Sequence, residues 1–450
     1  MNVKPIIAAV LALPLGFLPF SAAPAAPGPQ PMLAVALGGG GQIALVNTAS
    51  GKLVRIDVGS VIHGVGVLPD GRTAYAASRN SDEVSVIDLS RRKVIKRIDV
   101  GGRSHHIAVS PDGRWVYVTV DGNNTVAVID AGTAALATSI PVGAGPTYTV
   151  FSPDGSRAYV SSKKAGTISV IDMARMKVIK KITAGKQPDH LALTPDGNIL
   201  YVTNYGSNNV SAIDTRSDRV MATIPVGKGP HGIAVVERRG RLLVAVGNLA
   251  ETSLSLIDVA TNRVVQTIAL GTAPMHLTAS PDRNTLYIGS IPARQLLVYD
   301  VARGRVIKRI NLGGKVQIHQ IAVIKKPIMG GSKTIQSHGG SYHNIDARQL
   351  RVMMQDKAFL LINVHIPYQG ELPRTDRFIP FNKIEQNLDQ LPKDKSAKIV
   401  VYCRSGRMSA IAAKTLVKLG YTNVWNLKRG MRGWQQAGYP LLKKTHGSSG

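Results

Sequence analysis

A repeat of 42 residues constrains the fold of this chain more than any other feature. The turn Pro-Asp-Gly recurs at this interval, at residues 69–71, 111–113, 153–155 and 195–197. A second marker, close to Val-x-Ile-Asp, occurs seven times and ends at Asn47, Asp88, Asp130, Asp172, Asp214, Asp258 and Asp300. Such a period is typical of arrays in which each unit buries its apolar faces against its neighbours.

Each unit has the pattern of four short β-strands. In one unit they are expected at residues 148–151, 158–161, 167–170 and 178–182, where β-branched residues alternate with others between turn residues. A single four-stranded sheet cannot cover both its faces, whereas sheets stacked around an axis cover one another. Residues 33–36 match a second strand and residues 319–324 an isolated first strand. The sequence therefore predicts an all-β, seven-bladed β-propeller over residues 32–324, in which the two ends build one blade together.

This region resembles the YVTN family of β-propeller repeats. Tyr201-Val202-Thr203-Asn204 is the family signature, and residues 117–119 and 159–160 are close variants. The resemblance covers about residues 32–324. It implies the fold but not a function, because propellers host many unrelated functions.

Seven of the 11 histidines fall in two adjacent columns of the repeat, where the first strand of a unit starts. These column histidines are His63, His105, His106, His190, His231, His276 and His319. If the first strand is innermost, their rings meet at one mouth of the central channel, interrupted by Tyr148. Converging imidazoles suit copper or zinc, and their geometry resembles the copper-cluster domain of nitrous oxide reductases; protonated rings would instead attract anions. Alternatively, Pro-His-Gly is a common variant of this repeat whose copies duplicated together.

The first 26 residues have the layout of a secretory signal peptide. Lys4 precedes an apolar run from Ile6 to Phe20, and the small residues from Ser21 to Ala26 supply a cleavage site. Two prolines interrupt the run, which is shorter than the roughly 20 residues that a spanning helix needs. We therefore expect cleavage, no transmembrane segment afterwards, and a periplasmic or secreted protein.

A different pattern follows the propeller. Residues 325–341 are glycine-rich without periodicity, which predicts a flexible linker. From residue 342 to 443, strands alternate with helices, which predicts a small α/β domain with a parallel sheet. The expected strands are residues 359–364, 398–402 and 424–427, and the expected helices are residues 346–354, 382–391, 409–419 and 431–437.

Cys403 is the only cysteine of the chain, and it follows an apolar strand six residues before an expected helix. One cysteine excludes an intramolecular disulfide and any all-cysteine metal site. At such a place in a parallel sheet, loop amides and a helix N-terminus point into one crevice. With Arg404 and Arg407 they would stabilise a thiolate near neutral pH, and also an anionic persulfide.

Residues 342–443 resemble the rhodanese-type sulfurtransferases. The active-site loop carries the resemblance, Cys403-Arg404-Ser405-Gly406-Arg407-Met408-Ser409, together with residues 420–427, 430–434 and 438–440. The resemblance implies that Cys403 takes a sulfane sulfur from a donor such as thiosulfate, holds it as a covalent persulfide without an external cofactor, and passes it to a thiol, cyanide or protein acceptor. Residues 404–409 would supply the amide cradle that binds the substrate. A tyrosine-phosphatase loop, Cys-x5-Arg, is disfavoured because position 409 is serine.

Three departures from that family lie around the loop. Asn363-Val364-His365 stands where Asp-Val-Arg is usual, and residues 371–380 replace a Gly-His-Ile-Pro-Gly-Ala segment. The pocket wall opposite the cysteine is therefore altered, which leaves the sulfur donor open. A third, milder departure places Arg429 where a glycine is usual.

The chain has 55 Lys and Arg against 27 Asp and Glu, a net charge of +28, which favours anionic partners. The basic residues are spread over both domains without interleaved aromatics, so a nucleic-acid partner is not expected. Two functions remain. The favoured one is an exported sulfurtransferase of sulfur metabolism, whose propeller positions the second domain, docks a protein partner or binds a ligand. The alternative is a non-enzymatic binding protein whose column histidines hold a metal or an anion, with an accessory rhodanese-like domain.

Overall fold

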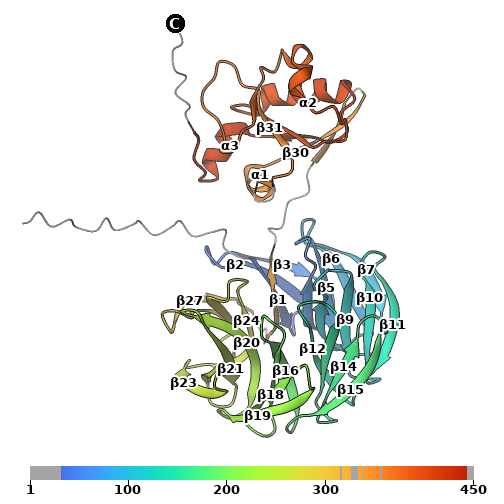
Figure 1. Ribbon diagram of the computed structural model, residues 1–450, viewed down its shortest axis with the longest axis vertical. Coiled ribbons are helices and arrows are strands. Elements are labelled where there is room, and N and C mark those ends of the chain that lie inside the picture. The colour runs from blue at the N-terminus through green and yellow to red at the C-terminus, as the bar shows by residue number, and fades with distance from the viewer. Residues whose placement is uncertain (1–31, 315–316, 326–332, 338, 355–356, 443–450) are drawn as a thin grey trace, which may run out of the picture. The chain divides into compact units, whose positions relative to one another are not determined.

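The computed structural model describes residues 32–314, 317–325, 333–337, 339–354 and 357–442 (Figure 1). The predicted signal peptide lies outside them. Within these residues the chain forms seven four-stranded sheets, followed by one six-stranded sheet with helices. None of the helices found in these ranges is long and apolar enough to cross a bilayer.

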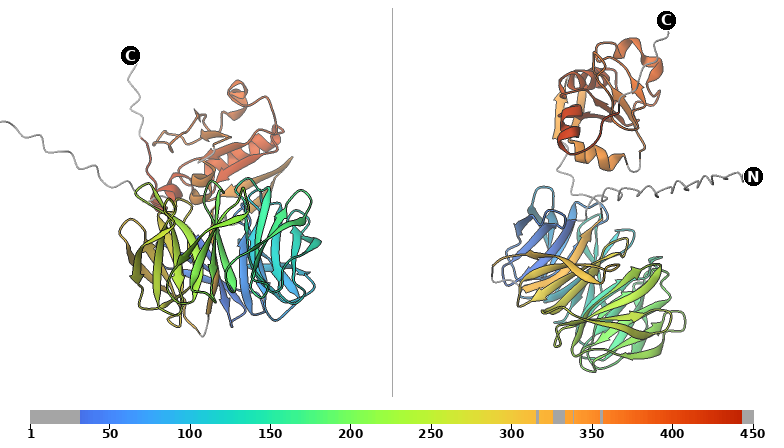
Figure 2. Two further views of the ribbon diagram at one scale, coloured as in Figure 1. Left: turned by 60° about the horizontal axis from the view of Figure 1, so that its bottom comes forward. Right: turned by 90° about the vertical axis from the view of Figure 1, so that its left-hand side faces the viewer.

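The seven four-stranded sheets are the blades of a β-propeller and fan around one axis (Figures 1 and 2). The innermost strands are β4 (Ile62–Val67), β8 (Ser104–Val109), β12 (Pro146–Phe151), β16 (Pro188–Leu193), β20 (Pro230–Arg238), β24 (Ala273–Ala279) and β28 (Gln317–Ile324). Next come β5 (Thr73–Ser78), β9 (Trp115–Val120), β13 (Arg157–Ser162), β17 (Ile199–Asn204), β21 (Arg241–Asn248), β25 (Thr285–Ile291) and β1 (Met32–Gly38). The third strands are β6 (Glu83–Asp88), β10 (Thr125–Asp130), β14 (Thr167–Asp172), β18 (Asn209–Asp214), β22 (Ser253–Asp258), β26 (Gln295–Asp300) and β2 (Gln42–Asn47). The outermost strands are β7 (Lys93–Asp99), β11 (Ala135–Pro141), β15 (Lys177–Thr183), β19 (Arg219–Pro225), β23 (Arg263–Ala269), β27 (Arg305–Asn311) and β3 (Leu53–Asp57).

Adjacent blades share one apolar core. Val170 on β14, for example, belongs to the same buried cluster as Val202 on β17 of the next blade. The second and third strands lie between two blades and are buried almost throughout, whereas outermost strands such as β15 are largely exposed. Each blade therefore depends on its neighbours for burial, as the repeat predicted.

The Pro-Asp-Gly turns explain why the repeat is so regular. In the second of these turns, Asp112 Oδ1 accepts the Arg114 N–H at 3.0 Å and Gly113 takes a φ of +75°. A Cβ on Gly113 would also lie 2.7 Å from Cδ of Pro69, the proline of the preceding turn. Successive turns therefore pack proline against glycine, which keeps both residues at a fixed interval.

The last propeller strand closes the ring. β28 pairs antiparallel with β1, so the two ends of the array share one blade, as predicted. The Gln320 side chain accepts the N–H groups of Val65 and Ile107 at 3.1 and 3.2 Å and donates to the Ile107 carbonyl at 2.7 Å. β28 thus begins among the column histidines, and Lys325 beyond it lines the cavity at the Pro-Asp-Gly turns.

The second domain has a six-stranded sheet in the order β29-β30-β34-β33-β31-β32, parallel except for the edge strand β29. Its strands are β29 (Lys333–Ser337), β30 (Gly340–Ile345), β31 (Leu360–Asn363), β32 (Arg377–Phe378), β33 (Ile399–Tyr402) and β34 (Val424–Leu427). Its helices are α1 (Ala347–Met353), α2 (Arg407–Lys418) and α3 (Gly430–Gln436). Two buried clusters form its core, one that includes α2 and one that includes α1 and α3.

The structure differs from the sequence expectations at three places in this domain. The sheet starts at Lys333, inside the segment 325–341 expected to be a linker, because β29 pairs with β30. Residues 382–391 form two 3₁₀ turns, Ile384–Gln386 and Leu388–Gln390, because Asn387 between them turns its side chain back to the Lys383 carbonyl. Helix α2 begins four residues after Cys403 rather than six, directly after Gly406 in the left-handed conformation.

Candidate functional site

Cys403 lies at the carboxyl end of β33, a central strand of the parallel sheet. The strand is fully buried, and Cys403 itself is only 1% exposed. Two residues supply hydrogen-bond donors to its sulfur. The Gly406 N–H lies 3.1 Å from Sγ, and the Ser409 hydroxyl lies 3.5 Å from it. The sulfur therefore has donors on the side of α2, which stabilise negative charge on it.

The first turn of α2 adds further donors. Its first hydrogen bond runs from the Ala410 N–H to the Gly406 carbonyl, so the N–H groups of Arg407, Met408 and Ser409 have no backbone acceptor within the described chain. The helix is 12 residues long, and its N-terminus carries the positive end of the helix dipole. Such a turn offers the free N–H donors that the predicted amide cradle over residues 404–409 requires.

Backbone contacts with α3 hold the loop. The N–H groups of Met431 and Arg432 donate to the carbonyls of Cys403 and Arg404 at 2.8 and 2.9 Å. A Cβ on Gly406 would lie 1.8 Å from the Lys428 carbonyl oxygen, so only glycine fits at this position. The backbone of the Cys403 loop is therefore in direct contact with the backbone of residues 428–432. Arg429, the third departure from the family, has a φ of −107°, which any residue adopts.

The altered pocket wall has its own set of contacts. Asn363 accepts the N–H of His365 at 3.1 Å and donates to the Gly370 carbonyl at 3.0 Å, so it holds the segment between them. His365 places Nδ1 3.3 Å from the sulfur of Met408, a residue of the loop. Burial lowers the pKa of His365, and the Arg404 guanidinium lowers it further. A neutral imidazole thus stands on the wall where the family has arginine.

A cavity of about 460 Å³ lies next to the loop. Arg404 and Arg432 line it together with Gln369, Met431, Gln435 and Leu441. Two guanidinium groups make this opening suitable for an anionic donor. Arg404, Ser405 and Arg407 are exposed, Met408 is half-buried, and Gly406 and Ser409 are buried. Gln369 and Gln435 could not be selected from the sequence, because neither lies in a recognisable motif.

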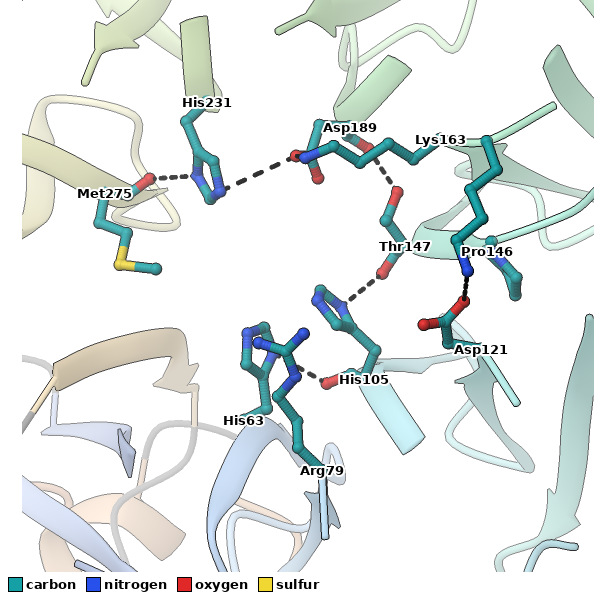
Figure 3. Close-up of a pocket in the computed structure, with 12 residues that line it drawn as sticks. His63, Arg79, His105, Asp121, Pro146, Thr147, Lys163, Asp189, His231 and Met275 are labelled. Carbon is teal, nitrogen blue, oxygen red and sulfur yellow. Dashed lines mark hydrogen bonds and ion pairs between the residues drawn. The ribbon is translucent and has the colours of Figure 1, made fainter. Parts of the chain in front are cut away.

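The column histidines lie at one mouth of the propeller channel, as expected. Three of them donate through Nδ1 to a carbonyl of the next blade. His63 bonds His105 O at 3.2 Å, His105 bonds Thr147 O at 3.1 Å, and His231 bonds Met275 O at 2.8 Å (Figure 3). A carbonyl only accepts, so Nδ1 of each ring carries the proton. These three hydrogen bonds each link two successive blades, which supports a structural role for part of the column.

The other column histidines, His106, His190, His276 and His319, are almost fully buried. The Tyr148 ring stacks on His106 with centroids 3.6 Å apart and lies 4.4 Å from His190. Only His190, His231 and His276 bring one ring nitrogen each to within 4.8 Å of the others, among the described residues. Four of the seven predicted ligands therefore lie outside this group.

Two charged residues at this mouth were missed in the sequence. Asp189 is 3% exposed and pairs with Lys163 at 2.8 Å (Figure 3). Both line a cavity of about 240 Å³ together with Arg79, His63, His105 and His231. Asp189 could have been found from the repeat, because it stands at the same repeat position as His63, His105 and His231 in their units.

Two family models match the chain. One, described as a YNCE-like beta-propeller, matches residues 41–192 and 73–241. The other, described as a rhodanese-like domain, matches residues 346–437. A sulfurtransferase from Allochromatium vinosum is 32% identical over 104 residues, which cover 22% of this chain and 94% of that protein. The thiosulfate sulfurtransferase PspE of Escherichia coli is 34% identical over 67 residues, 14% of this chain and 64% of that protein.

Solved structures resemble the propeller at lower identity. Hydrazine synthase from Kuenenia stuttgartiensis has a TM-score of 0.50 at 23% identity, covering 56% of this chain and 86% of that one. The dihydro-heme d1 dehydrogenase NirN has a TM-score of 0.53 at 22% identity, covering 67% of each chain. At such identities these likenesses show the fold alone. Through the match over residues 346–437 and the Allochromatium relative, the chain belongs to the rhodanese-like family, with a YNCE-like β-propeller ahead of its rhodanese-like domain.

Proposed function

We propose that the protein is an exported sulfurtransferase that carries sulfane sulfur as a persulfide on Cys403. The observation that carries this proposal is the setting of the Cys403 sulfur. It receives donors from Gly406 and Ser409, and it lies at the N-terminus of α2, whose first amides have no backbone acceptor within the described chain. A terminal sulfur added to Cys403 would carry negative charge next to these donors.

The proposed reaction has two balanced steps. The Cys403 thiolate attacks the outer sulfur of thiosulfate, the S–S bond of the donor breaks, and sulfite leaves with the bonding electron pair. The product is the Cys403 persulfide anion. An acceptor thiolate or cyanide then attacks the outer sulfur, and the Cys403 thiolate leaves. Arg404 and Arg432, which line the adjacent cavity, attract the anionic donor.

The propeller supplies the scaffold in this proposal, as the part that docks a protein partner or binds a ligand. Export rests on the signal-peptide pattern of residues 1–26. It is tested by the N-terminal sequence of the protein recovered from the periplasmic fraction. If the protein is found only in the cytoplasmic fraction, with an intact N-terminus, export is contradicted. The proposed reaction on Cys403 is not affected by that result.

Intact mass tests the chemistry directly, because Cys403 is the only thiol. Incubation with thiosulfate should add one sulfur, about 32 Da, and cyanide should remove it. Cys403→Ser should abolish the gain, whereas Ser396→Ala, an exposed change in the same domain, should not. If neither thiosulfate nor a low-molecular-weight persulfide adds sulfur to a Cys403 that still reacts with iodoacetamide, the proposal is wrong.

A further inference from the structure

Three histidine rings from three successive blades meet inside the propeller channel. They are His190 on β16, His231 on β20 and His276 on β24. Their ring centroids are 4.3 Å apart for His190 and His231, 4.7 Å for His190 and His276, and 5.2 Å for His231 and His276. One nitrogen of each ring lies within 4.8 Å of the other two. Side chains from separate sheets thus converge on one point.

Two of the three rings, those of His231 and His276, present a lone pair that no hydrogen bond of the described residues uses. His231 donates its Nδ1 proton to the Met275 carbonyl, so its Nε2 keeps a lone pair. His190 Nε2 and His276 Nδ1 are 3.0 Å apart and form one hydrogen bond, whose donor is set by the tautomers of the two rings. His276 is 4% exposed, and its Nε2 has no hydrogen-bond partner. A buried polar atom without a partner is costly and points to a bound ion or water.

Imidazole nitrogens are among the ligands that Cu²⁺ and Zn²⁺ prefer in proteins, and three of them lie together here.

A buried carboxylate stands beside the three rings. Asp189 Oδ1 is 3.4 Å from His190 Nδ1, and its Oδ2 is 3.9 Å from His231 Nε2. Its Oδ2 also pairs with Lys163 Nζ at 2.8 Å. His190 Nδ1 makes no hydrogen bond to Asp189 at this distance, but a small rotation of the ring would let it donate to the carboxylate, which would orient the ring and strengthen it as a metal ligand.

We propose that His190, His231 and His276 bind one divalent transition-metal ion, copper or zinc, at the channel mouth, with Asp189 as the carboxylate that orients His190. Metal–nitrogen bonds of about 2.0–2.1 Å require small ring rotations from the present separations. His231, one of the three rings, also lines the 240 Å³ cavity. Arg79 lines the cavity near His63 and His105, which disfavours a cation on that side (Figure 3).

The first test is metal binding by the untagged full chain. A Cys403→Ser background removes the competing thiolate. We expect about one Cu²⁺ or Zn²⁺ per chain after dialysis, measured by mass spectrometry of the metal. His231→Gln should weaken binding by at least about 100-fold and Asp189→Asn by about 10-fold.

His63→Gln is the matched control. His63 and His231 each donate Nδ1 to the next blade's carbonyl, so both variants lose the same kind of hydrogen bond, but only His231 belongs to the three-ring cluster. His63→Gln should therefore retain the affinity of the parent chain. Equal losses in the two variants, or no metal retained by the parent, would overturn the site.

X-ray absorption at the metal edge needs no histidine variant, so it holds even if His231→Gln fails to fold. In the wild-type chain we expect nitrogen ligands at about 2.0–2.1 Å. Sulfur at about 2.3 Å would instead place the ion on Cys403 and refute the proposal. Neither result depends on the proposed sulfurtransferase activity.

Discussion

Gly406 gives the sharpest test of how the Cys403 loop is held, and Gly420 supplies its control. The two glycines flank α2 and have similar positive φ angles, 92° and 87°. A Cβ at 406 would lie 1.8 Å from the Lys428 carbonyl oxygen, whereas a Cβ at 420 meets no atom within 4 Å. Gly406→Ala and Gly420→Ala therefore share the strain of alanine at positive φ, and only the first adds a backbone clash.

The expected difference follows from that clash. Alanine in the left-handed region costs about 1–2 kcal/mol, and we expect Gly420→Ala to lower the free energy of unfolding by this amount. At 406 the Lys428 segment must also move away by about 1 Å, which breaks the hydrogen bonds from Met431 and Arg432 to the loop, each worth about 1 kcal/mol. Gly406→Ala should therefore lose about 3–4 kcal/mol. A shift of about 1 Å in a catalytic loop should also slow sulfur loading of Cys403 by about 100-fold.

Urea unfolding followed by hydrogen exchange of peptides within residues 399–436 would measure this domain separately from the propeller. Intact mass after exposure to the sulfur donor would follow the loading of Cys403. If both alanine variants are destabilised equally and load sulfur at equal rates, the contact with Lys428 does not hold the loop, and the reasoning fails.

Three further predictions concern the sulfur, the channel and its closure. Ser409→Ala removes the hydroxyl donor to Cys403 Sγ, a hydrogen bond worth about 1 kcal/mol. We expect sulfur loading to be roughly 5-fold slower in single-turnover mass measurements, with an unchanged melting temperature. An unchanged loading rate would contradict a role for that hydroxyl. Burial lowers the pKa of His105 and His319 to about 4 and that of His231 to about 3, so the unfolded chain binds more protons between pH 6.5 and about 3. The propeller should thus lose stability as the pH falls through that window, and a urea midpoint that stays flat from pH 7 to 4 would refute this. Gln320→Ala leaves the N–H groups of Val65 and Ile107 without their side-chain acceptor, so it should lower the free energy of unfolding of the propeller in urea by about 2–4 kcal/mol. A loss below about 0.5 kcal/mol would show that the strand pairing alone closes the ring of blades.

The repeat predicted the propeller well because its spacing has a local cause. The glycines of the Pro-Asp-Gly turns have positive φ, and Gly113, Gly155 and Gly197 each pack on the proline of the preceding turn, so the sequence period is also the structural period. The helix expected from residue 346 also has a local cause, since the Gln349 N–H donates to Asp346 Oδ1 and the Asp346 N–H to Gln349 Oε1 at its start.

Long-range contacts account for what the sequence did not predict. β29 lies in a glycine-rich stretch with no pattern of its own and exists because β30 pairs with it. The helical spacing of residues 382–391 was misleading, because Asn387 interrupts it. Ring orientations separate three column histidines, with Asp189 beside them, from the other four, and the sequence does not specify these orientations. The three are His190, His231 and His276.

The pairing of β28 with β1 also fixes an order of events during synthesis. The Val65 N–H can form its hydrogen bond to the Gln320 side chain only after Gln320, 255 residues later in the chain, has been synthesised. At about 5–20 residues per second, the ribosome needs roughly 10–50 s to supply it. Until then the inner edge of β1 is an open strand edge, exposed to misassembly or to chaperones. The rhodanese-like domain is translated only after β28, so Cys403 leaves the ribosome once the propeller has every strand that it needs to close.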